Sequence, residues 1–246
     1  MILPTLLTRP TYAGEPSLIG EPDFSCLADL GPVPDNAFRL YLCRHGQTEN
    51  NRLRLVQGSR MHPSLNENGL QQAQRLGKAL AQASVPPTTI YHSPLRARQT
   101  AEAVAQQFIP SLNTAQPSNI REVDFGPTND GTSVEHAKNL MVATYTQWAI
   151  GDIDVKMPSD GESGREVSEG EAPFKRLYSH HTQLLNIFRP LLYYEQVLLR
   201  VEKSVDDLLE AGQQSPARCV AALSHSSFLL AAVQNISLVN VATIEV

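Results

Sequence analysis

The sequence predicts an α/β fold, with a three-layer α/β/α arrangement around a mainly parallel central sheet and a long helical insertion. Short β-rich runs at residues 38–43, 88–91 and 219–223 alternate with segments of helical periodicity, as in parallel-sheet proteins. The chain has 246 residues, of which 41% are hydrophobic and 18% charged, so it can bury one sizeable core. We therefore expect one domain at residues 38–246, preceded by an extended arm at residues 1–37.

Two helices are expected in the first half of this domain. Apolar residues recur at helical spacing at positions 70, 73, 76 and 80, which predicts a helix over about residues 67–83. Asn66 or Asn68 could cap it, because an asparagine side chain accepts from the free amides of a first turn. Further along, Ser93 and Pro94 favour a second helix, with serine as the cap and proline at the first helical position.

The second half contains fewer local signals. The β-rich run at residues 219–223 is followed by an apolar helix at residues 228–233, and residues 240–246 predict a last strand. Before residue 219 the sequence predicts a mostly helical stretch that is interrupted at Pro190. We expect this stretch to form a helical insertion at about residues 164–200.

Two histidines stand where predicted strands end. Arg44, His45 and Gly46 follow the strand at residues 38–43, and the glycine permits a tight turn there. His225 follows the strand at residues 219–223. Ligands of parallel sheets bind beyond the carboxyl ends of the strands, so we expect a site containing both histidines.

Composition excludes several kinds of partner. A net charge of −5 provides no broad cationic field for nucleic acid or an anionic membrane, and no apolar run approaches the roughly 20 residues that cross a bilayer. Three cysteines without a C-x-x-C pair indicate free thiols in a cytoplasmic compartment rather than disulfides or a zinc site. The arm at residues 1–37 could also serve as a targeting segment, so import into an organelle is an alternative to a cytoplasmic location. No pattern in the sequence indicates an oligomeric state.

The tripeptide Arg44-His45-Gly46 is a weak signal alone, but its context is extensive. It continues as Gln47-Thr48-Glu49-Asn50-Asn51, and it is followed by Gln57-Gly58 and by the motifs at residues 65–73 and 93–101. Further motifs are those at residues 121–126, 161–163 and 224–225. In this order and spacing the chain resembles the histidine phosphatase superfamily, the phosphoglycerate-mutase-like proteins, over residues 38–246 with one long gap.

The resemblance implies a phosphohistidine mechanism that needs no metal ion and no cofactor. It makes His45 the nucleophile, Glu122 the proton donor and His225 a residue that stabilises the transferring phosphoryl group. It also implies phosphate or substrate contacts from a set of polar positions: Thr48, Asn51, Gln57, Gly58 and Ser226, the last supplying a hydroxyl where the family has glycine.

General chemistry supports part of this assignment. A phosphate monoester is a dianion that resists attack, so an enzyme must neutralise its oxygens and place a nucleophile in line. Arg44 and Arg96 suit the first task, because a guanidinium donates parallel hydrogen bonds and stays charged. Nearby arginines should also lower the pKa of His45, which leaves a ring nitrogen available for attack.

The chain departs from the family pattern at two places near the expected site. The segment at residues 93–100 is one residue short; counting back from Thr100 selects Arg96 as the pocket arginine, and Arg98 is the alternative. The loop after Gly126 is also unfamiliar. Two other features are interpreted as structural: Tyr145 and Trp148 as core residues, and the pair His180-His181 as a solvated helix face rather than a metal site.

The expected function is hydrolysis of a small phosphorylated metabolite. The first alternative is a phosphoglycerate-type mutase, which ranks lower because the segment after Glu122 lacks the longer pattern typical of such mutases. The second alternative is a non-catalytic protein that binds or senses a phosphate ligand. The substrate is not encoded in any motif, since specificity depends on the loop after Gly126 and on the insertion, where the resemblance is thinnest.

Overall fold

Five parallel strands form the central sheet of the protein. The computed structural model describes residues 38–116, 120–149, 154–168, 210–225 and 241–244, together with positions 24, 27, 28, 30–33, 152, 207 and 208. Within them the sheet order is β3-β2-β4-β1-β5. The strands are β1 (Arg39–Arg44), β2 (Thr89–His92), β3 (Asn113–Ala115), β4 (Cys219–Ser224) and β5 (Val241–Ile244). The expectation of an α/β fold with a mainly parallel sheet is confirmed.

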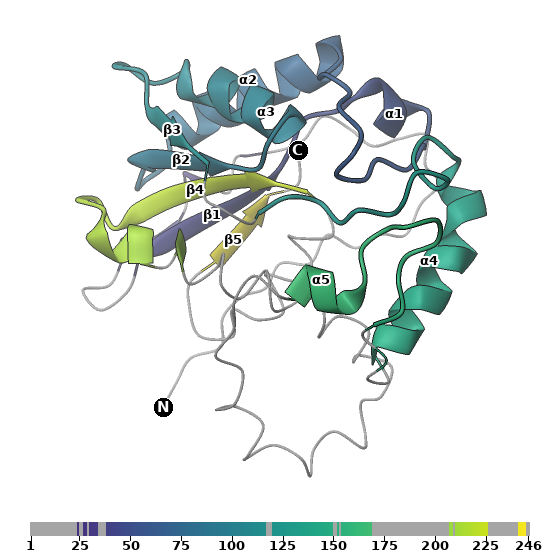
Figure 1. Cartoon of the computed structure of the whole chain (residues 1–246). Coiled ribbons are helices and arrows are strands. Elements are labelled where there is room, and N and C mark those ends of the chain that lie inside the picture. The colour runs from purple at the N-terminus through teal and green to yellow at the C-terminus, as the bar shows by residue number, and fades with distance from the viewer. Residues whose placement is uncertain are drawn as a thin grey trace, which may run out of the picture.

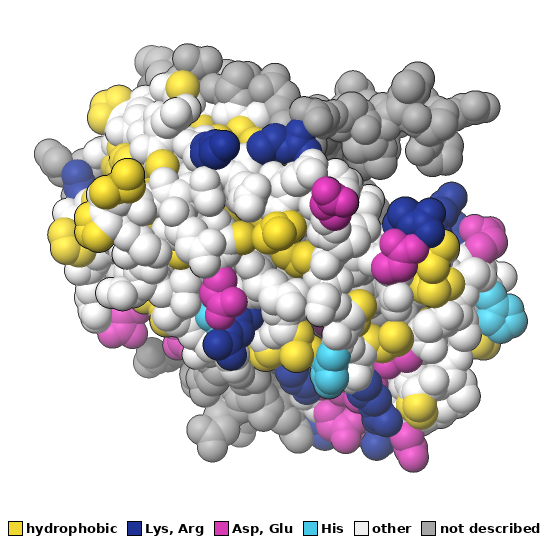
Figure 2. All heavy atoms as spheres, turned by 90° about the horizontal axis from the view of Figure 1, so that it is seen from above, with side chains coloured by type: hydrophobic (Ala, Val, Ile, Leu, Met, Phe, Trp, Pro, Cys, Tyr) yellow, Lys and Arg dark blue, Asp and Glu magenta, His cyan; other side chains and the backbone are white. Residues whose placement is uncertain are grey.

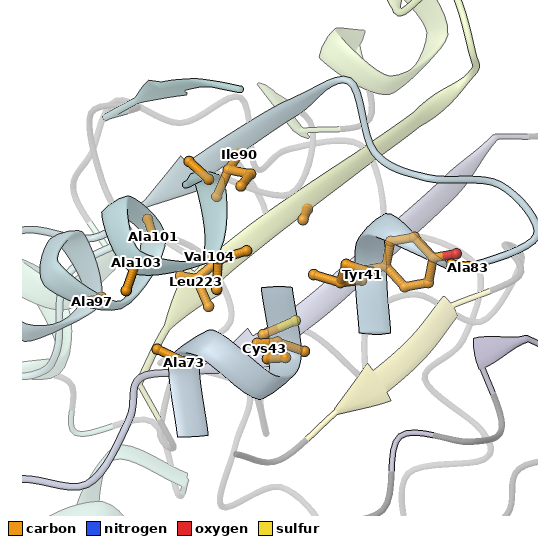
Figure 3. Packing of buried hydrophobic residues seen from close by; sticks show 14 of the residues in the cluster. Tyr41, Cys43, Ala73, Ala83, Ile90, Ala97, Ala101, Ala103, Val104 and Leu223 are labelled. Atoms are coloured by element: carbon orange, nitrogen blue, oxygen red, sulfur yellow. The ribbon is translucent and has the colours of Figure 1, made fainter. Parts of the chain in front are cut away.

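Two helices cover one face of this sheet. Helices α2 (Glu67–Ala81) and α3 (Arg96–Ala105) pack against each other and lie together above β2 and β4 (Figure 1). Their inward residues are small or aliphatic and fully buried, as Ala73 of α2 and Ala101 of α3 are. Figure 3 shows them packed against Ile90 and Leu223 of the sheet. Leu27, which belongs to the expected arm, is buried in the same cluster.

The opposite face is covered by a different set of segments. Helices α4 (Val134–Ala149) and α5 (Gly164–Ser168) lie on this side of the sheet (Figure 1), whereas the single turn α1 (Glu49–Arg52) lies beyond the end of β1. The core here combines Phe125 and Trp148 with Leu208. Trp148 is 1% exposed, so its interpretation as a core residue is confirmed.

The strand sequences explain why both faces can be covered. Side chains alternate between the two faces of a strand, and in β1 Leu40 and Leu42 join the cluster containing Trp148 while Tyr41 and Cys43 join the cluster under α2 and α3. All four residues are fully buried. A strand that is apolar on both sides is typical of a parallel sheet between two layers. Packing on both faces therefore holds the central strands β1 and β4 in place within the sheet. It also holds the residues that directly follow them.

Most expected elements are found close to their expected bounds. Asn66 rather than Asn68 caps α2, because its side chain accepts from the amide of Gly69 at 2.8 Å. The expectation that Ser93 and Pro94 open α3 is wrong. The helix begins at Arg96 after Leu95, which has a φ of 66° and provides no side-chain cap. The hydroxyl of Ser93 bonds instead to the ring of His225.

Other expectations fall partly or wholly outside the described residues. The insertion at residues 164–200 is described only for α5, and the helix at residues 228–233, the pair His180-His181 and Cys26 are not described.

Cys43 and Cys219 are free and buried, and burial raises the pKa of each thiol to about 12. Strand β3 was not expected from the sequence.

Charges of both signs are interspersed on the described surface over α2 and α3. Figure 2 shows this face, where Lys or Arg lies close to Asp or Glu at several places and the hydrophobic side chains form separate groups. None of the helices in the described part of the chain is long and apolar enough to span a bilayer.

Candidate active site

The two histidines expected at strand ends meet at the carboxyl edge of the sheet. β1 and β4 are adjacent, with Arg44 opposite Ser224, and the amide of His45 donates to the carbonyl of Ser224 at 2.9 Å. The ring centroids of His45 and His225 are 5.1 Å apart, with an edge-to-face angle of 61°. Both side chains are buried, at 4% and 3% exposure. The parallel register of two central strands therefore brings these residues together from opposite ends of the chain.

The hydrogen bonds of His45 determine its tautomer. Nδ1 lies 2.8 Å from the carbonyl oxygen of Gly46, and a carbonyl can only accept, so Nδ1 carries the proton. Nε2 then has a lone pair, and it accepts a hydrogen bond from Nε of Arg96 at 3.0 Å. Burial, followed by the charges of Arg96 and Arg44, holds the pKa of His45 well below its usual range. His45 is thus a neutral imidazole whose Nε2 can act as a nucleophile.

Arg96 is held in one orientation by the backbone of a neighbouring loop. Besides its bond to His45, it donates from Nη2 to the carbonyl of Gln57 at 3.0 Å and from Nη1 to that of Met61 at 3.3 Å. It is 2% exposed. Arg98, by contrast, is exposed and pairs with Glu102 at 2.7 Å. Arg96 is therefore the arginine that faces His45, although the shortened motif left the choice open.

The turn between β1 and α1 is locked against both α2 and α3. The amide of Gly46 donates to Oγ1 of Thr100 at 3.0 Å, and this hydroxyl donates to the carbonyl of Arg96 at 2.8 Å. A Cβ atom on Gly46 would collide with the backbone of Gly69 at the start of α2. Glycine is required here by close approach rather than by its φ angle. These contacts fix His45 relative to Arg96.

A pocket of about 250 Å³ opens beside His45. Its polar lining includes Arg44, His45, Asn51, Gln57, Arg96 and Glu122. Burial also lowers the pKa of Arg96, while the negative charge of Glu122 acts in the opposite direction. Nε of Arg44 is buried and has no hydrogen-bond partner among the described residues. The pocket therefore combines a nucleophile, two guanidinium groups and a carboxyl group, which suits a phosphate ester.

Glu122 is held by the segment that contains the motif Gly161-Glu162-Ser163. Its own Oε1 accepts from the amide of Val123 at 3.0 Å. Oε2 of Glu162 accepts from the amide of Asp124 at 2.8 Å, and the amide of Glu162 donates to the carbonyl of Asp124 at 2.9 Å. Glu162 also forms an ion pair with Arg121. The buried carboxylate of Glu162 thus binds residues on both sides of Glu122, namely Arg121 and Asp124.

Not every expected contact residue lines the pocket. Thr48 is the N-cap of α1, and its hydroxyl donates to Oε1 of Gln57 at 2.7 Å. Gly58 donates from its amide to Oδ1 of Asp130 at 2.7 Å. Both therefore support the loop around Gln57. His225 lies beside His45, with Nε2 bonded to the hydroxyl of Ser93, and is not among the described lining residues. Ser226 lies outside the described residues.

One wall of the pocket was not expected from the sequence. Helix α4 contributes residues at spacings of four, seven, eight and eleven, which is one face of a helix: Val134, Lys138, Met141, Val142 and Tyr145. Leu55, Val56 and Phe125 extend this apolar surface. Tyr145, interpreted as core, both lines the pocket and packs edge-to-face on Trp148 with centroids 5.2 Å apart. The helical spacing of these residues was the signal that could have revealed the wall.

The described residues do not suggest a metal centre. Nowhere in the part of the chain that the structure describes do three or more His, Cys, Asp or Glu side chains converge in a way that could hold a metal ion. The groups around His45 are mainly cationic or neutral, which favours an anionic ligand.

Comparison with known proteins defines the class to which this site belongs. The family model of the histidine phosphatase superfamily (branch 1) matches residues 40–185, which is more than half of the chain. The chain belongs to this superfamily. His45, Arg44, Arg96 and Glu122 lie within the matched range, whereas His225 lies beyond it.

Curated relatives include enzymes of more than one kind. The probable phosphoglycerate mutase GpmB of Citrobacter koseri is 33% identical over 135 residues, covering 53% of this chain and 58% of that protein. Fructose-2,6-bisphosphatase TIGAR B of Danio rerio is 36% identical over 106 residues, covering 42% of this chain and 40% of that protein. The match thus spans less than two thirds of either relative's length.

Solved structures show the same fold. A phosphoglycerate mutase from Bacillus anthracis str. Sterne aligns with a TM-score of 0.54 at 20% identity, covering 80% of this chain and 79% of that one. A putative alpha-ribazole-5'-P phosphatase from Escherichia coli aligns with a TM-score of 0.53 at 23% identity, covering 82% and 81%. At these identities the similarity defines the architecture and leaves the reaction to be argued from the site.

Proposed function

We propose that this protein is a phosphomonoester hydrolase that acts on a small phosphorylated metabolite through a phosphohistidine at His45. The observation that carries the proposal is the state of His45: a buried, neutral ring whose Nε2 accepts a hydrogen bond from Arg96, beside a pocket that Arg44 also lines. A neutral imidazole among fixed cations is suited to attack an anion, because the cations stabilise the charge that the attack brings in.

In the first step Nε2 of His45 attacks phosphorus and the bond to the ester oxygen breaks. Before this attack Arg96 must release Nε2, and its guanidinium, with that of Arg44, takes up the phosphoryl oxygens. The leaving oxygen needs a proton, and Glu122 is the carboxyl group in the pocket lining that can supply it. The products of this step are an alcohol and a phosphohistidine.

In the second step water attacks the phosphohistidine. The carboxylate of Glu122 takes a proton from the water, the N–P bond breaks, and inorganic phosphate leaves with Nε2 restored as a lone pair. His225 would act from beside His45, where its contact with Ser93 orients the ring. The same residues thus serve both halves of the cycle.

The competing reaction is phosphoryl transfer back to a second hydroxyl, as in a mutase. The relatives support neither reaction alone, because one is called a probable phosphoglycerate mutase and another a bisphosphatase. The two reactions differ in their acceptor: water yields inorganic phosphate, whereas a retained hydroxyl yields an isomer of the substrate.

The test is to incubate the protein with a panel of phosphomonoesters and to trap the phosphoenzyme under alkaline conditions, where phosphohistidine survives. We expect release of inorganic phosphate and an alkali-stable phosphoenzyme that His45→Ala lacks. Isomerised phosphoglycerate without phosphate release would favour the mutase. Turnover that survives His45→Ala would overturn the mechanism, and ligand binding without any turnover would indicate a non-catalytic phosphate sensor.

A further inference from the structure

The α4 wall of the pocket, defined by Val134, Lys138, Met141, Val142 and Tyr145, differs chemically from the floor around His45. Three of its five residues, Val134, Met141 and Val142, have no hydrogen-bonding group, Tyr145 adds an aromatic ring with a hydroxyl, and Lys138 is its one cation. The floor, which consists of Arg44, His45, Arg96 and Glu122, is in contrast formed by polar and charged side chains. The part of a substrate that lies beyond the phosphate must therefore contact a mainly apolar surface.

This surface discriminates between kinds of leaving group. A sugar or glycerol body would lose water from its hydroxyls against a wall where three of the five side chains cannot hydrogen-bond, which is costly. An aromatic or aliphatic body gains free energy by burial there. At about 250 Å³ the pocket is smaller than the roughly 300–1,000 Å³ typical of drug-sized ligands, so the body is about as large as one ring.

The charges of the pocket indicate a second anionic group on that body. Arg44, Arg96 and Lys138 line the pocket, and Glu122 is the only acidic residue among the lining residues that the structure describes. When Glu122 is protonated to act as the acid, a phosphate dianion balances two of these three cations. Lys138 is then left with an unbalanced charge at the opposite wall.

Lys138 is also available for such a contact. Its side chain is exposed, and no ion pair or hydrogen bond involves it within the described part of the chain. A lysine stem can lie along apolar surface while its ammonium group stays in water at the rim. The apolar neighbours one turn away, Val134 and Val142, provide that surface.

We infer that the pocket selects a phosphomonoester with an apolar, ring-sized body that carries a second anionic group, and that Lys138 binds this group. The inference rests on the proposed function, because it takes the phosphate to sit at His45. Lys138 is on this view a specificity residue, which changes the choice among substrates and not the chemical step.

The experiment compares two aryl phosphates whose leaving groups have similar basicity: 4-ethylphenyl phosphate and 4-(carboxymethyl)phenyl phosphate. Lys138→Met keeps a long apolar stem and removes the charge. Asn139→Met is the matched control, because Asn139 is exposed on the same helix and does not line the pocket. Glycerol 2-phosphate serves as a polar substrate without an apolar body.

We expect the protein to prefer the carboxylate ester in kcat/KM by about fivefold, as an exposed ion pair provides. Lys138→Met should remove this preference by lowering kcat/KM for the carboxylate ester about fivefold relative to the ethyl ester, and Asn139→Met should keep it. Equal losses on both esters, or a preference that survives Lys138→Met, would overturn the role of Lys138. Faster hydrolysis of glycerol 2-phosphate than of both aryl esters would overturn the apolar body.

A binding measurement separates this inference from the proposed function. In the background of His45→Ala, calorimetry with the two intact aryl esters should show about fivefold tighter binding of the carboxylate ester, lost on adding Lys138→Met. This result would stand even if no ester is hydrolysed by the unmodified protein. Equal affinities would contradict the inference while leaving hydrolysis at His45 intact.

Discussion

The floor of the pocket and its α4 wall are built on different principles. His45 on the floor and His225 beside it follow central strands and are at most 4% exposed. Both ring nitrogens of His45 and Nε2 of His225 are held by neighbouring residues. On the α4 wall, Val134 and Val142 are each 42% exposed. A nucleophile needs a fixed position relative to its cations, and two buried parallel strands provide it. A surface that selects the rest of a substrate needs only one face of a helix, so the two parts can change independently.

The largest effect is expected when the nucleophile is removed from the floor. We expect His45→Ala to lower kcat for an aryl phosphate by about 10⁴-fold or more, since the proposed intermediate forms on His45. Steady-state assays with phosphoenzyme trapping measure this effect. His62→Ala is the control, because His62 is exposed and does not line the pocket. Retention of a tenth of the activity by His45→Ala would exclude His45 as the nucleophile.

The second test concerns the arginine of the floor. Arg96→Lys should lower kcat by about 10²- to 10³-fold, because a lysine cannot reproduce the three directed contacts of the guanidinium. Arg98→Lys makes the same change on an exposed residue of the same helix and should leave kcat unchanged. Equal effects of the two substitutions, in the same assay, would argue against a special position for Arg96.

The third test uses the lowered pKa of His45. Below about pH 6.5 a histidine of the unfolded chain binds a proton that the buried, folded His45 does not. The free energy of unfolding should therefore fall as the pH falls below 6.5, by up to about 1.4 kcal/mol per pH unit from this residue, until the folded pKa is reached.

Urea unfolding between pH 7.5 and pH 5 measures this dependence. His45→Gln should show a shallower decline, while the contribution of His92, whose pKa burial also lowers, remains in both proteins. Identical slopes would mean that the pKa of His45 is not lowered in the folded state. Because the folded His45 stays neutral, its Nε2 should also remain available for attack below pH 6.5.

The smallest expected effects concern the wall. Val142→Ser should raise KM for 4-ethylphenyl phosphate by about threefold, because apolar contact is lost, and should change the free energy of unfolding by under about 1 kcal/mol at so exposed a site. Leu140→Ser is the matched control, since Leu140 is 45% exposed on the same helix but outside the pocket. If both substitutions change KM equally, the wall is not in contact with the substrate.

Local features of the sequence were sufficient to predict much of the sheet and the floor. The apolar runs of β1, β2 and β4 alternate toward two cores, and the cap at Asn66 involves residues close in sequence. Ser93 shows where such reasoning fails: its local context favours a cap, yet its hydroxyl contacts His225, 132 positions away. β3 has three residues and no distinctive pattern.

The sequence alone determined the chemical kinds of residue at the floor, since the motifs around His45, Arg96 and Glu122 are short and their order along the chain is readable. Only the tertiary structure decided that Arg96 rather than Arg98 faces His45, that Thr48 and Gly58 support the loop instead of lining the pocket, and that α4 forms the opposite wall. The physical reason is that periodicity and turn preferences act between neighbours in the chain. The direction of a side chain into a shared pocket depends on packing between segments far apart in sequence.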